Sequence, residues 1–403
     1  MQTTPKGFRL HLGIFGRRNV GKSSLLNALT HQPTSIVSET AGTTTDPVEK
    51  PMELLPIGPV LWIDTAGIDD EGALGELRIQ KTKSVLDRTE IGIIVSTADA
   101  PISRFELDLI IAFRNRSVPV IYVLNKIDAA QPRPETIDEL KSLNIPYVMT
   151  DALTGRGIID LHKILLQAVP DDFLTPPPIL VDLVPPKSMI ILVVPVDKEA
   201  PKGRLILPQV QTIREILDAH LSCVVVQDTQ LDDAIKRITP APALVVTDSQ
   251  AFAKVAEIVP QSIPLTSFSI LYARQKADLK IMIEGARAIK NLKTGSRVLI
   301  AESCTHHPIE EDIGTIKIPK LLQKYVGGEI EFKHVRGHEF LTDDFNCELV
   351  IHCGACMWNR REMLSRIMYC QNANIPITNY GLAIAYTLGI FDRAIKPILD
   401  ATS

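Results

Sequence analysis

Two stretches of this sequence combine cysteine with histidine, side chains that bind soft metal ions in proteins. They are His352-Cys353-Gly354-Ala355-Cys356 and Cys304-Thr305-His306. Each follows an apolar run, residues 349–351 in the first case and 298–301 in the second, so each is expected in a loop at the carboxyl end of a buried strand. Such loops converge in an open α/β sheet, and the pattern therefore predicts one site with three thiols and two imidazoles.

Thiolates favour zinc or an iron–sulfur cluster over hard cations, and the spacing by itself fits either. The candidate ligands are Cys304, Cys353, Cys356, His306 and His352. The alternative is that the C-x-x-C cysteines are small buried hydrophobes, as free cysteines usually are. A matching C-x-H motif after a second strand makes the metal site the better interpretation. The other cysteines fall within apolar strand or helix patterns and are expected in the core: Cys223, Cys347 and Cys370.

The N-terminal part of the chain contains a phosphate-binding loop. Residues 16–23 read G-R-R-N-V-G-K-S, the G-x-x-x-x-G-K-S pattern, between an apolar run at 10–15 and an amphipathic helical pattern. Backbone N–H groups at the start of that helix would cradle phosphates, Lys22 would supply charge to the β- and γ-oxygens, and the Ser23 hydroxyl would bind Mg²⁺. The residues expected around the phosphates are Gly16, Asn19, Val20, Gly21, Lys22, Ser23 and Ser24.

Two later motifs define the nucleotide. In the D-T-A-G element at 64–67, Asp64 is expected to hold Mg²⁺ through water and the Gly67 N–H to meet the γ-phosphate. Asn125-Lys126-Ile127-Asp128 follows a strand pattern and resembles the guanine-specificity motif of GTPases. A carboxylate at Asp128 can accept hydrogen bonds from guanine N1–H and N2–H, whereas adenine would leave it unpaired at a cost. The three motifs in this order predict a GTP-binding domain.

Finer details of this domain resemble the TrmE- and Era-like branch of the translation-factor-related GTPases. Residues 41–46, A-G-T-T-T-D, match the switch I pattern G-T-T-x-D. The resemblance implies that Thr44 closes on Mg²⁺ when GTP is bound and that Asn19 helps to hold a K⁺ ion. Such an ion would supply the positive charge that an arginine finger gives elsewhere, so catalysis is expected to depend on Lys22, Thr44 and Asn19. Ile68 stands where Ras-like enzymes place glutamine, which predicts slow intrinsic hydrolysis or the use of another group.

The last nucleotide motif departs from its usual form. S-A-K or S-A-L is expected, and the sequence reads Asp151-Ala152-Leu153. The Ala152 N–H can still be offered to the guanine oxygen, whereas the role of Asp151 stays open.

Composition indicates a soluble protein of several domains: 403 residues, 45% hydrophobic, with a net charge of −4. The absence of a basic excess argues against nucleic-acid binding. Apolar runs fall short of the roughly 20 residues needed to span a bilayer, so no membrane contact is expected. Residues 1–7 are polar and lack the apolar core of a signal peptide. Six cysteines without disulfide-scaffold density suggest the reducing cytoplasm.

Alternating strand and helix patterns predict an α/β fold with three domains. Residues 1–172 are expected to form the P-loop GTPase domain, a mostly parallel sheet with helices on both faces. Residues 173–178 contain a proline run and predict a semi-rigid linker. The middle α/β domain, 179–266, lacks a phosphate loop or catalytic cluster, so holding the subunits of a homodimer together is its expected role. The last α/β domain, 267–403, opens with a predicted long helix over 272–292 and carries the cysteine motifs.

This order of a TrmE-like GTPase, a middle α/β domain and a C-x-H…H-C-x-x-C domain resembles the HydF family over essentially the whole chain. HydF proteins are the GTPase and scaffold of FeFe-hydrogenase maturation. The resemblance implies a dimerisation role for the middle domain and a 4Fe–4S iron–sulfur cluster held by Cys304, Cys353 and Cys356, with the fourth iron position open or loosely held. His306 and His352 match motif positions and would either bind iron or orient the cysteines. It also implies a diiron precursor with CO and cyanide ligands, built through two radical-SAM maturases and passed to the apo-hydrogenase.

Two other functions stay open. A ribosome- or RNA-associated GTPase with a structural zinc would explain the same cysteines, but no basic patch or RNA-binding module accompanies them. A metal-insertion GTPase that delivers nickel or zinc is expected to carry a His-rich tract, which this sequence lacks. For the scaffold, we expect GTP and K⁺ to order residues 43–46 as a switch, and hydrolysis to GDP to change how partners dock.

Overall fold

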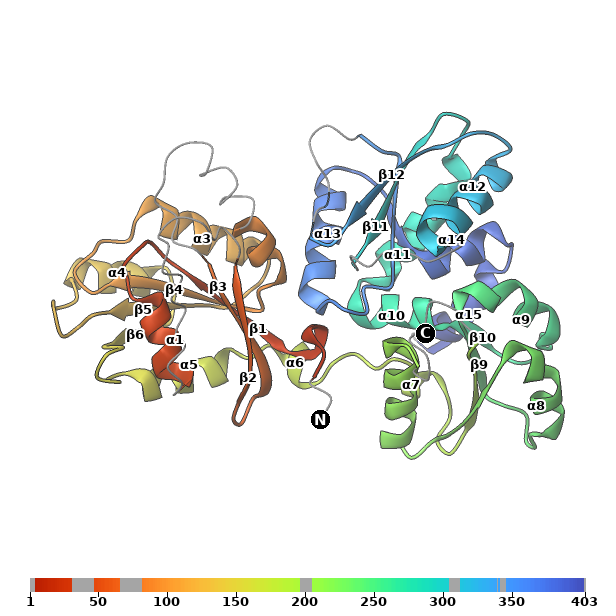
Figure 1. The fold of residues 1–403 in the computed structure, drawn as a ribbon, viewed down its shortest axis with the longest axis horizontal. Coiled ribbons are helices and arrows are strands. Elements are labelled where there is room, and N and C mark those ends of the chain that lie inside the picture. Colours follow the sequence, from red (N-terminus) through yellow and green to blue (C-terminus); the bar gives the residue numbers. More distant parts are fainter. Residues whose placement is uncertain are drawn as a thin grey trace. The chain divides into compact units, whose positions relative to one another are not determined.

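The computed structural model describes residues 4–30, 47–65, 82–195, 205–303, 312–338, 340 and 346–401. The chain forms two compact units, Met1–Pro176 and Pro177–Ser403 (Figure 1). The change from one unit to the other falls inside the predicted proline-rich linker, 173–178, just after the short helix α6 (Asp171–Leu174). Within the described ranges, no helix is both long enough and apolar enough to cross a membrane.

The first unit is built on a six-stranded sheet in the order β2-β3-β1-β4-β5-β6. The strands are β1 (Leu10–Phe15), β2 (Val48–Leu54), β3 (Gly58–Asp64), β4 (Ile91–Thr97), β5 (Val120–Asn125) and β6 (Tyr147–Thr150). Neighbouring strands run parallel except β2, which is antiparallel to β3. Every residue of β1 and β5 is buried, because strands of a parallel sheet covered on both faces carry near-continuous apolar runs.

Helices cover both faces of this sheet. Helices α1 (Lys22–Thr30) and α5 (Ile158–Ala168) pack over one hydrophobic core, and α3 (Arg104–Asn115) and α4 (Pro134–Ser142) over another. The alternation of side chains along β3 separates the two cores: Trp62 belongs to the first, whereas Leu61 and Ile63 belong to the second. The observed architecture confirms the predicted fold class of the GTPase part.

The second unit contains two four-stranded sheets, and the neighbouring strands in both run parallel. The first has the order β10-β9-β7-β8, with β7 (Met189–Val193), β8 (Ser222–Val226), β9 (Leu244–Thr247) and β10 (Leu265–Ser267). The second has the order β12-β11-β13-β14, with β11 (Arg297–Glu302), β12 (Glu331–Arg336), β13 (Leu349–His352) and β14 (Ile377–Asn379). Strand β10 spans the predicted domain boundary between residues 266 and 267.

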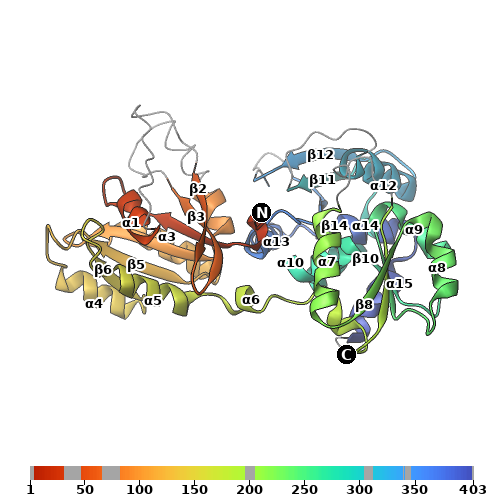
Figure 2. The same ribbon diagram turned by 60° about the horizontal axis from the view of Figure 1, so that its bottom comes forward.

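One hydrophobic core joins the two sheets, so both α/β halves belong to the same compact unit. Helix α10 (Phe268–Lys276) contacts α7 (Leu207–Asp218) from the first half and α13 (Arg360–Asn372) and α14 (Tyr380–Thr387) from the second. The last helix, α15 (Phe391–Ala401), packs against β10 (Figure 2). Further α-helices of this unit are α8 (Leu231–Arg237), α9 (Phe252–Ile258), α11 (Leu279–Arg287) and α12 (Ile318–Val326).

The single long helix predicted over 272–292 is wrong. Helix α10 ends at Lys276 and α11 begins at Leu279. Asp278 lies between them as the N-cap of α11, where its carboxylate accepts a hydrogen bond from the Ile281 N–H at 3.2 Å. An aspartate that caps a new helix competes with continuation of the preceding helix. The apolar periodicity continues across the break, so periodicity alone predicts one helix.

Candidate functional site

Lys22 closes the phosphate loop on itself. Its ammonium nitrogen donates to the carbonyl oxygens of Gly16 and Arg17, both at 2.8 Å, and the residue is buried. Gly21 has a φ angle of 94°, and a side chain there would come within 2.3 Å of Asn125 Nδ2. Glycine is therefore required where the phosphate loop passes the guanine motif, on conformational and steric grounds together.

Asn125 joins the phosphate loop to the segment after β6. Its Nδ2 donates to the Val20 carbonyl at 2.9 Å, while its Oδ1 accepts from the Thr150 hydroxyl at 3.0 Å and from the Ala152 N–H at 3.3 Å. The carboxamide is almost fully buried, so these bonds fix the spacing of the loops that would surround a nucleotide. The structure thus brings the predicted phosphate and base segments together at the carboxyl edge of the sheet.

Asp151, whose role the sequence leaves open, stabilises the turn after β6. Its carboxylate accepts a hydrogen bond from the Leu153 N–H at 2.9 Å and another from the Thr154 hydroxyl. These bonds, that of Thr154 first, lower the pKa of Asp151 below its ordinary value. The departure from the usual motif therefore has a local structural reason.

The Mg²⁺ side of the site is formed by α1 and the end of β3. The Ser23 hydroxyl donates to Asp64 Oδ2 at 3.3 Å, and the other carboxylate oxygen, Oδ1, is buried without a hydrogen-bond donor in the described part of the chain. Burial raises the pKa of Asp64, while Lys22, Ser23 and Lys50 act in the opposite direction. A buried carboxylate oxygen beside a hydroxyl suits a hard cation, so these residues fit Mg²⁺.

Lys50 is a charged neighbour of this site that the sequence motifs do not indicate. It lies on β2, where the antiparallel register pairs it with Trp62 and pairs Val48 with Asp64. Its ammonium nitrogen is shielded from solvent and has no acceptor among the described residues. Desolvation lowers the pKa of Lys50, and attraction to Asp64 partly opposes this. No motif marks Lys50, because its position depends on strand register.

Asp128 is the exposed carboxylate at the end of the guanine motif, and Lys126 before it donates to the Asn19 carbonyl. Asp128→Asn is expected to weaken guanine-nucleotide binding by about 100-fold, since each lost charge-assisted hydrogen bond contributes about 1.5–3 kcal/mol. The asparagine NH₂ can donate to the extra xanthine oxygen, so xanthosine nucleotides should bind better than guanosine nucleotides. Titration with fluorescent GDP and XDP analogues measures this change of preference.

Asp138→Asn is the matched control, because Asp138 is an exposed carboxylate on α4 whose neighbour is Lys141. It should leave both affinities unchanged. Equal GDP affinity in Asp128→Asn and the parent protein would contradict the base assignment.

The cysteine motif of β13 lies at the switch point of the second sheet. The order β12-β11-β13-β14 means that the chain leaves β11 toward β12 on one side and returns to β13 on the other. Ligand sites in open α/β sheets form where strand order reverses in this way. Cys353 directly follows β13, and Ser303 directly follows β11. The Ser303 N–H donates to the Cys353 sulfur at 3.2 Å, and its hydroxyl lies 3.1 Å from the same sulfur.

Four of the predicted site residues lie outside the described residues: Thr44, Gly67, Cys304 and His306. Within the described ranges, no three side chains of histidine, cysteine, aspartate or glutamate gather to hold a metal ion. The structure therefore shows two of the three predicted cysteines, Cys353 and Cys356, both partly buried. Ala355 between them has a φ of 51°, in the left-handed region that residues other than glycine seldom adopt. Two soft thiols on one tight loop, one with a backbone N–H donor, fit an iron–sulfur cluster or zinc.

His352 is fully buried, and both of its ring nitrogens are engaged. Its Nδ1 lies 2.8 Å from the Cys353 carbonyl oxygen, and its Nε2 lies 3.0 Å from the Arg366 guanidinium. Burial and, to a smaller extent, the positive charge of Arg366 lower the pKa of His352 to about 3. The hydrogen bond to the Cys353 carbonyl acts in the opposite direction but is the smallest of these effects. The imidazole is therefore neutral and, in this structure, has no nitrogen available to a metal.

Glu302 is the carboxylate nearest in sequence to Cys304, and it is also engaged. It accepts from the Tyr380 hydroxyl at 3.0 Å and from Arg336 Nε at 3.1 Å. A side chain on Gly314 would come within 2.2 Å of the Tyr380 oxygen, so the polypeptide packs closely around this pair. Tyr380 and Arg336 therefore hold the Glu302 carboxylate at the end of β11, and each of its two oxygens already accepts a hydrogen bond.

The other cysteines agree with their predicted core positions. Cys347 and Cys370 are buried, and Cys223 is partly buried on β8. Burial raises the pKa of the Cys370 thiol to about 12, so it stays protonated and is a poor metal ligand.

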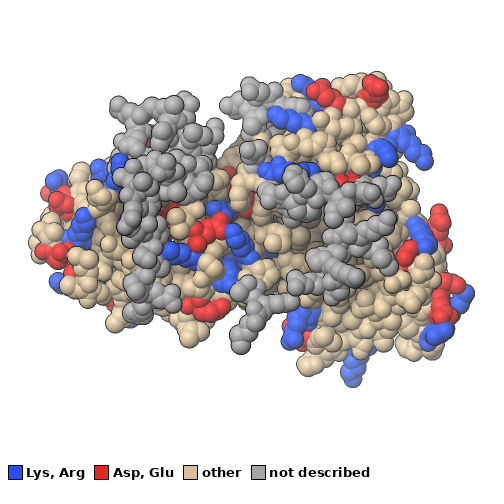
Figure 3. Space-filling model, viewed as in Figure 1, with Lys and Arg blue, Asp and Glu red and all other residues tan. Residues whose placement is uncertain are grey.

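Charges of both signs are interspersed on the molecular face seen in Figure 3. Helix α8 illustrates this, since it pairs Lys236 with Asp232 and Arg237 with Asp233. Among the described residues of that face, no continuous basic surface of the kind that binds a phosphate backbone is visible.

The fold and sites define a P-loop GTPase domain followed by a unit of two parallel sheets, the second carrying a cysteine loop at its carboxyl edge. Three family models match the chain: 50S ribosome-binding GTPase over residues 11–126, Hydrogen maturase F dimerization domain over 179–277 and Hydrogen maturase F tetramerization domain over 280–397. The two maturase models together match more than half of the chain and adjoin where α10 gives way to α11. The chain belongs to the hydrogen maturase F family.

Similar curated proteins match about two fifths of the chain. GTPase Der from Mycoplasmopsis pulmonis is 34% identical over 169 residues, 39% of this chain and 39% of the relative. The tRNA modification GTPase MnmE from Latilactobacillus sakei subsp. sakei is 33% identical over 169 residues, 40% of this chain and 36% of the relative. The chain thus spans under half the length of these relatives. Among solved structures, an Era variant from Aquifex aeolicus bound to GDP.AlF4- is 25% identical with a TM-score of 0.36, over 52% of this chain and 65% of that one.

Proposed function

We propose that the protein is a cytoplasmic, GTP-hydrolysing scaffold of FeFe-hydrogenase maturation. It holds a 4Fe–4S cluster and carries a diiron precursor with CO and cyanide ligands, made through two radical-SAM maturases, to the apo-hydrogenase. The observation that supports this most is the Cys353 thiol beside Ser303 at the switch point of a sheet within a hydrogen maturase F domain. Ser303 directly precedes Cys304 in the sequence, and its strand, β11, pairs with β13, the strand before Cys353.

In this proposal Cys304, Cys353 and Cys356 hold the cluster. Three thiolates leave one iron position for an exchangeable ligand, which is the chemistry that a carrier needs. His306 stays a candidate for that position, whereas His352 orients the loop through the Cys353 carbonyl. Ser303 contributes its N–H to the Cys353 sulfur, and hydrogen bonds to sulfur stabilise the thiolate.

The nucleotide acts as a switch in this proposal. Lys22, Ser23 and Asp64 hold the phosphates and Mg²⁺, with K⁺ beside Asn19 and with Thr44 closing on the metal when GTP is present. GTP hydrolysis releases the switch segment 43–46, which contains Thr44, and this changes how partner proteins dock. The separation of the chain into two compact units supports a docking role for GTP over a direct one in cluster chemistry.

Anaerobic reconstitution with iron and sulfide, followed by visible absorption and EPR after reduction, tests the scaffold proposal. It predicts about four irons per chain, a charge-transfer band and a reduced 4Fe–4S signal. The loaded protein should also activate apo-hydrogenase when both radical-SAM maturases are supplied. A colourless protein with one tightly held zinc would overturn the proposal and favour a GTPase with a structural zinc site.

We also propose that two chains pair through β8, in the part that matches the dimerization model. Strand β8 is at the edge of its sheet and is rich in valine, and Val225 is 44% exposed. Val210 and Leu217, seven residues apart on α7, are also exposed beside it. An exposed apolar edge strand is a template for pairing with another strand, and a second copy of β8 would extend the sheet.

Val225→Glu is expected to raise the dimer dissociation constant at least about thirtyfold, because a charge at the centre of an apolar interface costs about 2 kcal/mol or more. Size-exclusion chromatography with light scattering over a concentration series measures the change. Ile111→Glu is the matched control, since Ile111 is a similarly exposed apolar residue on α3. An unchanged dimer in Val225→Glu would place the subunit contact elsewhere.

A further inference from the structure

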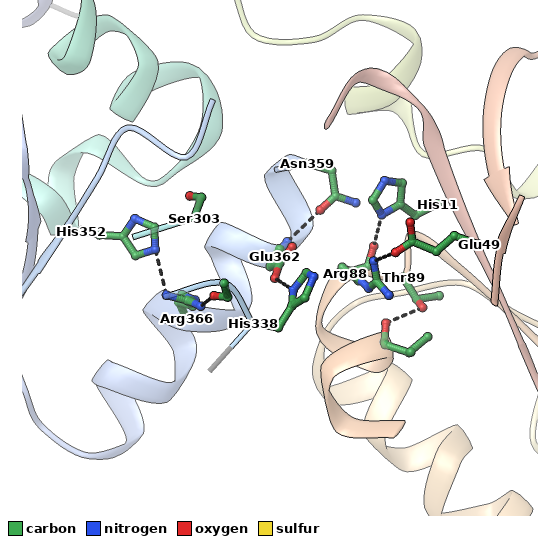
Figure 4. Close-up of polar contacts among 12 residues, drawn as sticks. His11, Glu49, Arg88, Thr89, Ser303, His338, His352, Asn359, Glu362 and Arg366 are labelled. Atoms are coloured by element: carbon green, nitrogen blue, oxygen red, sulfur yellow. Dashed lines mark hydrogen bonds and ion pairs between the residues drawn. The ribbon is translucent and has the colours of Figure 1, made fainter. Parts of the chain in front are cut away.

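We infer that Arg366 is the positioning residue of the cysteine loop: it fixes the tautomer and orientation of His352 and, through His352, the peptide that follows Cys353. Its effect on a bound cluster rests on the proposed function, whereas its effect on His352 does not. Arg366 lies on α13, and His352 is the last residue of β13, so the contact joins two elements of the same half of the second unit (Figure 4).

The Arg366 guanidinium is held rigidly. The residue is 3% exposed, and its second terminal nitrogen donates to the Gly337 carbonyl at 2.6 Å. Its guanidinium carbon lies 4.4 Å from the ring centre of Phe340 and 4.2 Å from that of Trp358. A planar cation between two aromatic rings is stabilised by its electrostatic attraction to both faces. Arg366 is therefore anchored independently of His352.

Trp358 has a second ring partner, His338. The His338 ring stacks on Trp358 with centroids 5.7 Å apart and an interplanar angle of 8°, and His338 Nδ1 lies 2.6 Å from the buried Glu362 carboxylate. Trp358 follows the C-x-x-C motif by two residues. Trp358 at the end of the cysteine loop and His352 at its start therefore contact the same Arg366 guanidinium.

The hydrogen-bonding capacity of arginine decides where the His352 proton lies. A guanidinium has five donors and no acceptor, so His352 Nε2 at 3.0 Å from Arg366 must be the acceptor. The ring proton is then on Nδ1, which donates to the Cys353 carbonyl at 2.8 Å. Two hydrogen bonds therefore connect Arg366, through the neutral His352 ring, to the carbonyl of Cys353. We call this connection the relay.

The relay fixes a peptide plane within the loop. The Cys353 carbonyl and the Gly354 N–H belong to one planar trans unit and point in opposite directions, so holding the carbonyl also sets the N–H. Among the described residues, nothing lies within 4 Å of a Cβ placed on Gly354, so close packing around this residue does not fix the loop. We therefore expect the loop to lose its defined orientation when Arg366 is replaced.

The charge of Arg366 has a second consequence for a bound cluster. Reduction potentials of iron–sulfur clusters depend on the net charge and hydrogen bonding around their sulfurs. The buried positive charge of Arg366, connected by hydrogen bonds to the Cys353 peptide, stabilises the reduced cluster, which is the more negatively charged state. Removing it should shift the reduction potential to more negative values.

The first experiment uses the metal-free full chain labelled with ¹⁵N-histidine, because this arm does not depend on a cluster. Long-range ¹H–¹⁵N NMR should show His352 as the Nδ1–H tautomer, with the resonance assigned by His352→Gln. Arg366→Met should convert it to a mixture of tautomers, whereas Arg360→Met should not. Arg360 is the matched control because it lies on the same helix and donates to the Gln275 and Ala277 carbonyls. A protonated His352, or the Nε2–H tautomer, in the unmodified protein would overturn the inference.

The second experiment is an EPR-monitored redox titration of the reconstituted full chain. Arg366→Met should shift the reduction potential to more negative values and change the EPR line shape, while Arg360→Met should match the unmodified protein. Arg366→Lys keeps the charge but loses the planar fork that contacts His352 and Gly337 together. Its potential should lie between the two, and it serves if Arg366→Met does not fold. An unmodified protein without a cluster refutes the proposed function and leaves the NMR arm to decide on Arg366. A normal cluster with identical potentials in all variants refutes the inference alone.

Discussion

Replacement of Cys353 by serine is expected to abolish cluster binding and to leave GTP hydrolysis within about twofold of the unmodified protein, since serine is a hard, protonated ligand in place of a soft thiolate. Cys353 is the thiol whose sulfur receives the Ser303 N–H at the meeting point of β11 and β13. The serine oxygen could still accept that bond, so the strand ends need not separate. The loss should therefore fall on the metal and not on the fold.

Hydrolysis should survive because the nucleotide motifs belong to the other compact unit, Met1–Pro176, which has its own sheet and its own cores. Iron and sulfide per chain report on the cluster, and phosphate release reports on the GTPase. Cys370→Ser is the matched control, since it removes a buried thiol of α13 that is protonated at neutral pH. Iron retained at the level of the unmodified protein would remove Cys353 from the ligand set. Loss of iron and hydrolysis together would instead indicate that the two units share stability.

The GTP site could be predicted from the sequence because its chemistry is local. A phosphate loop needs backbone N–H groups, glycines and one lysine within a few residues, and the observed contacts of Lys22 and Gly21 follow from that spacing. The strand before it is also local information, since every residue of β1 is buried and all but His11 are apolar or small. The class of domain, its sheet and the position of its ligand edge were therefore accessible from pattern and motif alone.

The surroundings of the cysteine loop could be predicted only in part. The motif itself places Cys353 and Cys356 after a strand, and the alternation of strands and helices places that strand in a parallel sheet. The partner of His352, however, is Arg366, which is 14 positions away on the next helix and has no motif of its own. Whether a motif histidine binds metal or orients a loop depends on which donor packs against its second nitrogen, and that is a property of tertiary packing.

A similar limit applies to the break between α10 and α11. The apolar positions on either side have helical spacing, so periodicity favours one helix, and a single capping aspartate decides for two. Lys50 is a further example, because it reaches the vicinity of Asp64 through the pairing of β2 with β3. Each of these features is fixed by a register or a cap that the average pattern does not contain.

Lys22→Ala is expected to reduce GTP hydrolysis by about a thousandfold, the scale on which positive charge at the transferring phosphoryl group affects such reactions. The ammonium of Lys22, a charged hydrogen-bond donor, is held inside the phosphate loop by the Gly16 and Arg17 carbonyls. Alanine removes this donor together with the two bonds that close the loop, so GTP affinity should fall as well. The cluster content should stay unchanged, because the cysteine loop lies in the other unit.

The same variant tests whether GTP controls the exchange of partners. If the nucleotide is a switch, then dissociation of a radical-SAM maturase and transfer of the diiron precursor should differ between GTP and GDP in the unmodified protein, and this difference should disappear in Lys22→Ala. Lys141→Ala, an exposed lysine on α4, controls for the loss of a surface charge and should keep the difference. Surface-attached maturase and stopped-flow transfer to apo-hydrogenase provide the two rates. A ligand can shift an equilibrium only through its own differential affinity for the two states. If Lys22→Ala no longer bound GTP and the rates of exchange still differed between GTP and GDP, the nucleotide site would not control partner exchange, and the scaffold role would be separate from the GTPase.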